Sequence, residues 1–510
     1  MIDSAAQRNV GVVLSYVNMG LQMLVSLLYT PIMLNLLGQS EYGLYSLSNS
    51  TISYLSLITL GMGGAYTRFY VRYKVRNDEK GIRELNGMYM LFYGIAAVVA
   101  ILAGVFLVQN SEVIFKALSP DEVSTTKVLM ALLMFNLAIS FPCSIFSSYI
   151  GATEHFIFQR VVTTVKTFCN PLVVLPVLAM GYGSIGYAVC TVSINLAMEL
   201  ANIIYAMVKL RMRFSFRNFK FSLLREVFVF SFFILLNQII DQVNGNVGNF
   251  LLGVFQGSLA VAVYGVAQSI TGYFFQFSTA ISSVYSTRVN EMIAKEQGSS
   301  ALTDLMIQVG RVQFMVMALL LSGLIVFGKP FVWLWAGEGY TDAYYIILLI
   351  CIPVTVPLIQ NIGIEIQRAM NKHHIRSIAY AIMALFNVLV SIPMIRIHGA
   401  VGAAIGTSVS YVVCNIVFMN FYYHMALGLD MVRFWKSISR FIPALVLPSL
   451  CGIMIATSSV NLYSWQMLMP WIGVYTVVYL VSMALFGLNK DERAFLVHNM
   501  NKVFKRRTCG

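Results

Sequence analysis

The sequence contains few charged residues. Only 11% of its 510 residues are Asp, Glu, Lys or Arg, whereas 58% are hydrophobic and the mean hydropathy is +0.76. Soluble globular chains carry about 25% charged residues. The composition therefore excludes a soluble globular enzyme and predicts an integral membrane protein.

Cysteine is also scarce and scattered. The seven cysteines form no CxxC pair, and all but Cys509 lie in apolar segments, so we expect neither a disulfide framework nor a metal site.

The first apolar run begins near Val10 and lacks a small-residue cleavage site. We interpret it as a retained membrane span rather than a signal peptide.

Long hydrophobic runs are abundant. A helix needs about 20 apolar residues to cross a bilayer core of about 30 Å. We therefore expect an all-α integral membrane protein of about fourteen transmembrane helices. The predicted spans are residues 10–36, 41–67, 87–108, 126–150, 161–181, 184–208, 226–253, 257–284, 303–328, 344–367, 377–397, 399–423, 438–459 and 466–487.

Positive charge is almost absent from one side of this arrangement. With a cytoplasmic N-terminus, the outer side holds only four of the 34 Lys and Arg residues: Lys116, Lys127, Lys329 and Arg396. The positive-inside rule then predicts a plasma-membrane protein with both termini in the cytoplasm. The same rule accounts for the net charge of +13 without a nucleic-acid partner.

An internal repeat divides the sequence. Asn170 and Pro176 recur as Asn387 and Pro393, at an offset of 217 residues. Six spans per copy give both copies the same orientation, and parallel repeats of this kind are a transporter architecture. The expected parts are an N-terminal six-helix lobe (1–208), a C-terminal six-helix lobe (209–426), and two extra helices with a basic cytoplasmic tail (427–510).

Amide and hydroxyl side chains recur at helical spacing in the first two spans of each half. A lipid-facing helix has no use for such groups, so we expect them to face other helices or water. For any single residue the alternative is an ordinary interhelical hydrogen bond, worth about 0.6 kcal/mol. Together the matched stripes favour a hydrated cavity between the halves. The candidate cavity residues are Asn18, Gln22, Asn237, Gln268 and Gln276.

Two acidic residues lie deep within predicted spans. Asp241 is about 15 residues into its span, or roughly 22 Å along a helix, where an unpaired aspartate costs about 2.5–3.5 kcal/mol. We hypothesise a raised pKa and a role in proton or cation exchange. Glu199 is the second deep acid. An ion pair with Lys166 of the preceding antiparallel span is geometrically possible; alternatively, Lys166 binds a substrate phosphate.

Three arginines lie at or near span ends. Arg68 and Arg288 close the second and eighth spans, and Arg311 comes early in the ninth. Taken singly, each arginine is explained by the positive-inside rule, which places Arg and Lys at the cytoplasmic ends of spans. Alternatively, with Lys166 they form a basic mouth for a phosphorylated lipid, because guanidinium groups suit phosphate oxygens.

Several ordered motifs carry a family resemblance. They are TPIMLNLLGQSEYGLYSL (30–47), LITLGMGGAYTRFYVRYK (57–74), the segment 241–264, and the Asn, Gly, Gly-Ala-Ala, Thr pattern of 387–407. The chain resembles bacterial polysaccharide and oligosaccharide flippases of the O-antigen repeat-unit type, within the multidrug, oligosaccharidyl-lipid and polysaccharide exporter superfamily.

The resemblance implies two six-helix lobes in a V shape, with two helices added. It implies alternating-access translocation of an undecaprenyl-diphosphate-linked oligosaccharide for O-antigen, capsule or exopolysaccharide synthesis, without covalent chemistry. Arg68, Lys166, Arg288 and Arg311 would bind the diphosphate, and Asp241, with Glu199, would serve ion coupling. No cofactor is expected beyond a coupling ion, H⁺ or Na⁺; the partners would be membrane lipids and other polysaccharide-assembly proteins.

One departure and two alternatives remain. The first span carries no Arg or Lys, although some lipid-diphosphate flippases place cations there; Asn18 and Gln22 occupy that face instead. The first alternative is a cation-coupled multidrug exporter of the same superfamily. The second is a polysaccharide polymerase or ligase, which the short external loops disfavour.

Overall fold

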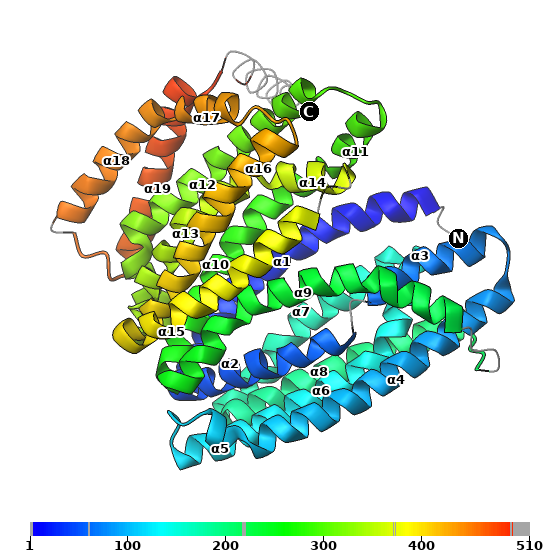
Figure 1. The fold of residues 1–510 in the computed structure, drawn as a ribbon. Coiled ribbons are helices and arrows are strands. Elements are labelled where there is room, and N and C mark those ends of the chain that lie inside the picture. Colours follow the sequence, from blue (N-terminus) through cyan, green and yellow to red (C-terminus); the bar gives the residue numbers. More distant parts are fainter. Residues whose placement is uncertain are drawn as a thin grey trace, which may run out of the picture. The chain divides into compact units, whose positions relative to one another are not determined.

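The computed structural model describes residues 4–59, 62–216, 221–370, 372, 374–458, 460–489 and 492, with side chains left out at some helical positions. Every regular element among these residues is a helix (Figure 1), which confirms the all-α prediction. In chain order the elements are α1 (Ser4–Leu37), α2 (Gln39–Ser53), η1 (Tyr54–Thr59), α3 (Met62–Val75), α4 (Glu79–Gln109), α5 (Ser111–Ile114), α6 (Pro120–Ala152), α7 (Phe156–Ala179), α8 (Gly183–Ile204), η2 (Tyr205–Lys209), α9 (Phe221–Phe255), α10 (Ser258–Ser283), α11 (Ser286–Ala294), α12 (Ser299–Ala336), η3 (Glu338–Tyr340), α13 (Ala343–Ile359), α14 (Asn361–Ala369), α15 (His374–Ser410), η4 (Tyr411–Phe418), α16 (Met419–Ala426), α17 (Met431–Ser439), α18 (Ile442–Thr457), α19 (Trp465–Ser482) and η5 (Met483–Gly487).

Many of these helices are long enough to cross a membrane. In the described part of the chain ten qualify by length and hydropathy, or eleven if the bent pair α17–α18 is one span. One of them, Ile375–Ala426, has 52 residues. As one straight helix it would measure about 78 Å, more than twice the ~30 Å bilayer core, which suits the two spans predicted there. The total of fourteen stays a prediction.

The chain folds into two compact units. Unit 1 comprises Met1–Val266 and Tyr380–Thr407, and unit 2 comprises Ala267–Ala379 and Ser408–Gly510. Each unit therefore combines segments that are distant in the sequence. The lobes expected from the internal repeat, with boundaries at 208 and 426, stay a prediction.

Helix α6 is central to unit 1, where it packs against α2, α3, α4 and α8. Its start follows from local sequence. Ser119 and Glu122 form a capping box, in which the serine hydroxyl accepts from the Glu122 N–H and the Glu122 carboxylate accepts from the Ser119 N–H. Pro120 occupies the first turn, where no N–H is needed.

The second predicted span is broken. Residues 41–67 were expected to form one helix, but α2 ends at Ser53, a 3₁₀ turn (η1) follows, and α3 begins at Met62. Hydroxyl groups explain the change of pitch, because Ser53, Ser56 and Thr59 each donate to the carbonyl three residues earlier. Such side-chain bonds compete with the α-helical ladder and bend helices.

A tight reversal lies within α15. Gly399 has φ 56° and ψ −132°, which breaks the helix between the eleventh and twelfth predicted spans. The two arms then approach closely: a Cβ on Gly402 would overlap the Met394 carbonyl, and one on Gly406 would overlap Ser391. The Asn387 side chain accepts hydrogen bonds from Ser391 (2.9 Å) and Thr407 (3.4 Å). The glycine-rich motif at 387–407 thus serves helix packing.

Helix α12 is the corresponding centre of unit 2. It packs against α13, α14, α17, α18 and α19. Phe327 of α12 lies in an apolar cluster with Ile455, Leu468 and Tyr475 of the C-terminal helices. The Tyr479 hydroxyl donates to the Met315 carbonyl (2.8 Å). The C-terminal helices α18 and α19 are therefore joined to α12.

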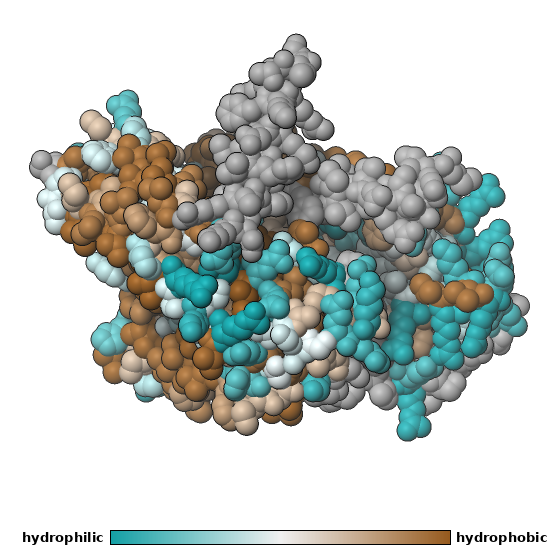
Figure 2. All heavy atoms as spheres, turned by 90° about the horizontal axis from the view of Figure 1, so that it is seen from above, coloured by the Kyte–Doolittle hydropathy of each residue, from teal (hydrophilic) through white to brown (hydrophobic). Residues whose placement is uncertain are grey.

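The outer face of α18 is apolar. Ile442, Leu450, Ile453 and Met454 are all exposed, and brown side chains predominate at the left of Figure 2, where Figure 1 places this helix. In water such a surface would be unfavourable, whereas lipid tails solvate it well. The exposed face is that of a membrane-spanning helix.

We predict that Gly402→Ala destabilises the protein by about 1–3 kcal/mol, because the added methyl group overpacks the crossing. The matched control is Gly94→Ala in α4, where a Cβ meets nothing within 4 Å; it should be neutral or raise stability by up to ~1 kcal/mol. Thermal unfolding of both purified variants in detergent measures this. Equal melting temperatures for the two would contradict the close crossing.

Candidate functional site

Polar side chains of α2 and α9, which cover parts of the second and seventh predicted spans, bond to each other. The Gln242 amide of α9 donates to the Ser53 hydroxyl of α2 (2.5 Å), and the Asn249 amide donates to the Ser50 hydroxyl (3.0 Å). Going from Gln242 to Asn249 along α9, the bonded partner on α2 changes from Ser53 to the earlier residue Ser50. The two helices therefore run antiparallel. At these positions the stripes form an interhelical polar seam.

The amide of the first predicted span is also used in packing. Asn18 is 5% exposed; its amide nitrogen donates to the Arg160 carbonyl of α7 (2.9 Å), and its oxygen accepts from the Thr164 hydroxyl. Asn18 thus joins α1 to α7. Its predicted role as a cavity residue stays a prediction, and the contacts favour the alternative of interhelical bonding.

The other candidate cavity residues differ in exposure. Gln22 and Gln276 are exposed, and Gln268 is half-buried. The side chains of Asn237 and Asp241 lie outside the described residues, although the backbone places both in α9. The hydrated cavity and the coupling role of Asp241 therefore stay predictions.

Lys166 and Glu199, for which an ion pair or a substrate-binding role was predicted, lie on adjacent helices. Lys166 lies on α7 and Glu199 on α8; these helices pack together, and the two side chains interact electrostatically. Lys166 is exposed and Glu199 half-buried. The Asn202 amide lies 3.5 Å from the Glu199 carboxylate, as its donor. The structure thus places a lysine and an acid that interact on two adjacent apolar helices.

Two of the predicted arginines lie on exposed positions. Arg68 is in α3 and Arg288 in α11. Near Arg288, the Glu365 carboxylate of α14 accepts from the Ser286 hydroxyl (3.0 Å) and from Arg368 (3.0 Å). Helices α11 and α14 are short and lie against each other. Arg288 of α11 and Arg368 of α14 are both exposed.

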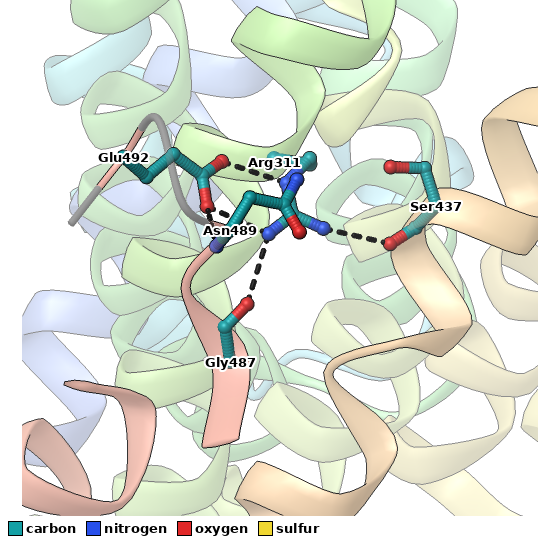
Figure 3. A network of polar contacts seen from close by, with 5 residues as sticks. All are labelled: Arg311, Ser437, Gly487, Asn489 and Glu492. Carbon is teal, nitrogen blue, oxygen red and sulfur yellow. Dashed lines mark hydrogen bonds and ion pairs between the residues drawn. The ribbon is translucent and has the colours of Figure 1, made fainter. Parts of the chain in front are cut away.

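Arg311 has a different environment. It is 1% exposed, and Figure 3 shows its guanidinium between the chain around Ser437 and the segment that follows α19. It donates to both oxygens of Glu492 (2.7 Å each) and to the carbonyls of Ser437 and Gly487 (2.9 Å each). The group also lies 4.3 Å from the centre of the Phe441 ring.

This network fixes the C-terminal helices to α12. A bidentate carboxylate, two carbonyls and a ring face occupy the guanidinium, and such planar forks are well suited to buried ion pairs. The geometry favours a structural role for Arg311 over the diphosphate binding expected from the sequence. The sequence offered no local signal, because Glu492 lies 181 residues away.

Glu492 depends on the same network. Partial burial opposes its ionisation, but hydrogen bonds from Arg311 and from the Asn489 N–H outweigh burial and hold the pKa of the carboxyl below its ordinary 4.5. A carboxyl with a lower pKa in the folded state stabilises the fold above its unfolded pKa. That contribution is lost as the pH falls through the folded pKa.

Two carboxylates at helix N-termini were missed by the sequence reasoning. Glu41 of α2 accepts from the N–H (2.9 Å) and the hydroxyl of Ser184 at the start of α8. Glu122 of α6 accepts from the Ser40 hydroxyl (2.9 Å) and from the Ser258 hydroxyl. The Ser-x-x-Glu capping signature of Ser119–Glu122 was the available signal.

Among the described residues no three His, Cys, Asp or Glu side chains gather as metal ligands. The polar groups of the helices instead bond to one another, as in the α2–α9 seam, or present cations at exposed positions. This arrangement offers charge and hydrogen bonding to a ligand.

The fold defines a class of membrane protein. The structure is similar to that of the lipid II flippase MurJ in an inward closed conformation, with a TM-score of 0.74, 14% identity, and coverage of 93% of this chain and 98% of that one. It is also similar to an inward-facing multidrug resistance transporter of the MATE family, at a TM-score of 0.64 and 14% identity, over 82% of this chain and 99% of that one. The chain therefore shares the fold of these two membrane proteins, and several of its helices are long and apolar enough to span a membrane.

The family follows from the sequence. Residues 8–286, more than half of the chain, match the family of polysaccharide biosynthesis proteins, and the protein belongs to that family. A curated relative is the probable low-salt glycan biosynthesis flippase Agl15 of Haloferax volcanii, 23% identical over 181 residues. That match spans 34% of this chain and 36% of the relative, about a third of its length.

We predict that Glu492→Gln lowers the stability of the protein at pH 7 by about 1.5–3 kcal/mol, because a hydrogen-bonded charge is removed from Arg311. The deficit should shrink at a pH below the lowered folded pKa of Glu492, where the wild-type carboxyl becomes protonated. Melting temperatures at the two pH values measure the effect, with Glu291→Gln, an exposed substitution in α11, as control. A deficit that does not change with pH would contradict the assignment.

Proposed function

We propose that this protein is a flippase that moves an undecaprenyl-diphosphate-linked oligosaccharide from the cytoplasmic to the outer leaflet of the plasma membrane. Two six-helix lobes alternate their access, and no covalent chemistry takes place. The product serves a surface polysaccharide: O-antigen, capsule or exopolysaccharide. Both termini lie in the cytoplasm, on the side that carries most of the Lys and Arg residues.

The family and its relatives support this proposal. The chain belongs to the polysaccharide biosynthesis proteins, its curated relative is named as a glycan biosynthesis flippase, and its fold is similar to that of a lipid II flippase. Each of these points to a lipid-linked glycan as the class of substrate. The oligosaccharide and its polyprenyl-diphosphate carrier are the finer part of the proposal.

Lys166 is the observation that carries the proposal. Lys166 is an exposed residue of α7, a helix apolar enough to span the membrane. A cation there is costly unless it faces water or an anion, and Glu199 supplies only partial compensation from a neighbouring helix. We assign Lys166 to the substrate diphosphate, with Arg68 and Arg288 as further cations at exposed positions.

Export of cationic drugs is the second candidate, because the fold is also similar to that of a multidrug resistance transporter. The two functions require ligands of opposite charge. A cavity for cationic drugs would favour acidic groups, whereas the accessible charges assigned above are basic.

Translocation in proteoliposomes tests the proposal. A polyprenyl-diphosphate oligosaccharide is incorporated into the vesicles, and a membrane-impermeant periodate reagent measures the fraction of sugar on the outer leaflet, with and without an imposed H⁺ or Na⁺ gradient. We expect protein-dependent exposure of the sugar. Absence of translocation together with drug-driven proton exchange would instead establish a drug exporter.

We predict that Lys166→Gln lowers the translocation rate by about tenfold or more, because a charge-assisted hydrogen bond to phosphate is worth roughly 1.5–3 kcal/mol. The matched control is Lys329→Gln, an exposed lysine at the opposite end of the spans, which should leave the rate unchanged. Adding Glu199→Gln to Lys166→Gln separates the two roles. Restored transport in the double variant would show that Lys166 and Glu199 only compensate each other's charge and that Lys166 does not bind the phosphate.

For the coupling role, we predict that Asp241→Asn abolishes the dependence of transport on the ion gradient while substrate binding persists. A neutral amide can neither release a proton nor bind a cation as a carboxylate does. Initial rates with and without the gradient, measured between pH 6 and pH 8, are the test. A variant that responds to the gradient as the wild type does rejects Asp241 as the coupling residue.

A further inference from the structure

Three helices begin around a single carboxylate in unit 1. Glu122 lies in the first turn of α6, Ser40 in that of α2 and Ser258 in that of α10. The Glu122 oxygen Oε1 accepts from both serine hydroxyls, and the two hydroxyl oxygens lie 3.2 Å apart. Helix N-termini carry partial positive charge, so three of them stabilise the ionised carboxylate.

The backbones around this carboxylate are in direct contact. A Cβ on Gly43 of α2 would overlap the Ser258 carbonyl, and one on Gly257 would lie 3.1 Å from the Ala117 carbonyl. Gly257 also has φ 88°, which suits glycine. Phe250 of α9 contacts the rings of Tyr54 and Phe115. The α9–α10 corner is therefore packed against α2 and the α5–α6 connection.

Glu122 differs from these surrounding contacts in chemistry. The contacts of Gly43, Gly257 and Phe250 are apolar or involve neutral backbone. The chain between Phe250 and Tyr264 contains no ionisable side chain other than the Tyr264 phenol. A carboxylate that accepts hydrogen bonds from hydroxyl groups makes stronger, more directional hydrogen bonds than a neutral acceptor does. Among these contacts, the bond between Glu122 and Ser258 therefore depends most on a single chemical group, the Glu122 carboxylate.

The joined residues come from different halves of the predicted repeat. Ser40 and Glu122 belong to the lobe 1–208, and Ser258 to the lobe 209–426. The charge pattern assigns this end of the spans to the outside. Under the proposed function, the lobes must part here when the substrate leaves toward the outer leaflet, and the Glu122–Ser258 bond must then break.

We propose that Glu122 is a latch that holds the outer ends of the two lobes closed through its bond to Ser258. The inference rests on the proposed alternating access and adds to it a specific closing contact. Ser40 stays with Glu122 in the same lobe and orients the carboxylate. Opening therefore exchanges the Ser258 bond for bonds to water, with no covalent step.

Glu122→Gln separates the latch from the folding role of this residue. Glutamine at the third position of a helix still completes a capping box with Ser119, so α6 keeps its start, but the charge is lost. Ser258→Ala removes the other partner and leaves the charge. If both act on one bond, their effects do not add in the double variant.

Distances between spin labels measure the closed and open populations. Labels are attached to cysteines at Ser124 of α6 and Leu259 of α10, both exposed, in a full-length chain whose native cysteines are replaced. We expect one short distance in the parent. Glu122→Gln and Ser258→Ala should each raise the ratio of open to closed by about tenfold, the factor for one charge-assisted hydrogen bond.

The matched control is Glu112→Gln. Glu112 pairs with Lys127 at the same end of the spans (2.6 Å), at an exposed position, and its loss should leave the distances unchanged. Distributions identical to the parent for Glu122→Gln and Ser258→Ala would overturn the latch, as would an equal shift for Glu112→Gln. The measurement uses no substrate, so failed glycan transport with a shifted distribution would reject the proposed substrate and keep the latch.

Discussion

A charged group within a bundle of apolar helices must be paired, hydrogen-bonded or wet, because an uncompensated charge in a low-dielectric interior is costly. The structure meets this constraint in different ways. Arg311 is enclosed by a carboxylate, two carbonyls and a ring, and Glu122 by hydroxyl groups of two other helices. In both cases compensation joins helices that are far apart in sequence, so the charges hold the fold together.

Lys166 differs from these groups in its exposure, and this difference is the reason for assigning it to the substrate in the proposed function. It remains exposed on an apolar helix, with the half-buried Glu199 as a nearby acid. A structural ion pair of the Arg311 type would enclose the cation. An accessible cation in a protein of the polysaccharide biosynthesis family is suited to an anionic headgroup that arrives and leaves.

The sequence predicted what depends on local pattern. Apolar runs of helical length gave the all-α membrane fold. The Ser-x-x-Glu signature at the start of α6 was also a local signal, but the expected span began at residue 126 and did not use it. The sequence could not predict the break after Ser53, where hydroxyl groups turn back onto their own helix, nor the pairing of Arg311 with a residue 181 positions away. Asn18 shows the remaining ambiguity, since an amide on a polar stripe serves a cavity or a neighbouring helix equally well, and only its bonds to α7 favour the latter.

The central claim is that the protein recognises a lipid diphosphate through accessible cations. Native mass spectrometry of the purified protein with a polyprenyl-diphosphate oligosaccharide, in competition with its monophosphate analogue, tests this most directly. The account predicts at least about tenfold tighter binding of the diphosphate, since the second phosphate adds charge-assisted bonds. Equal affinity for the two lipids, or binding of neither, would contradict it.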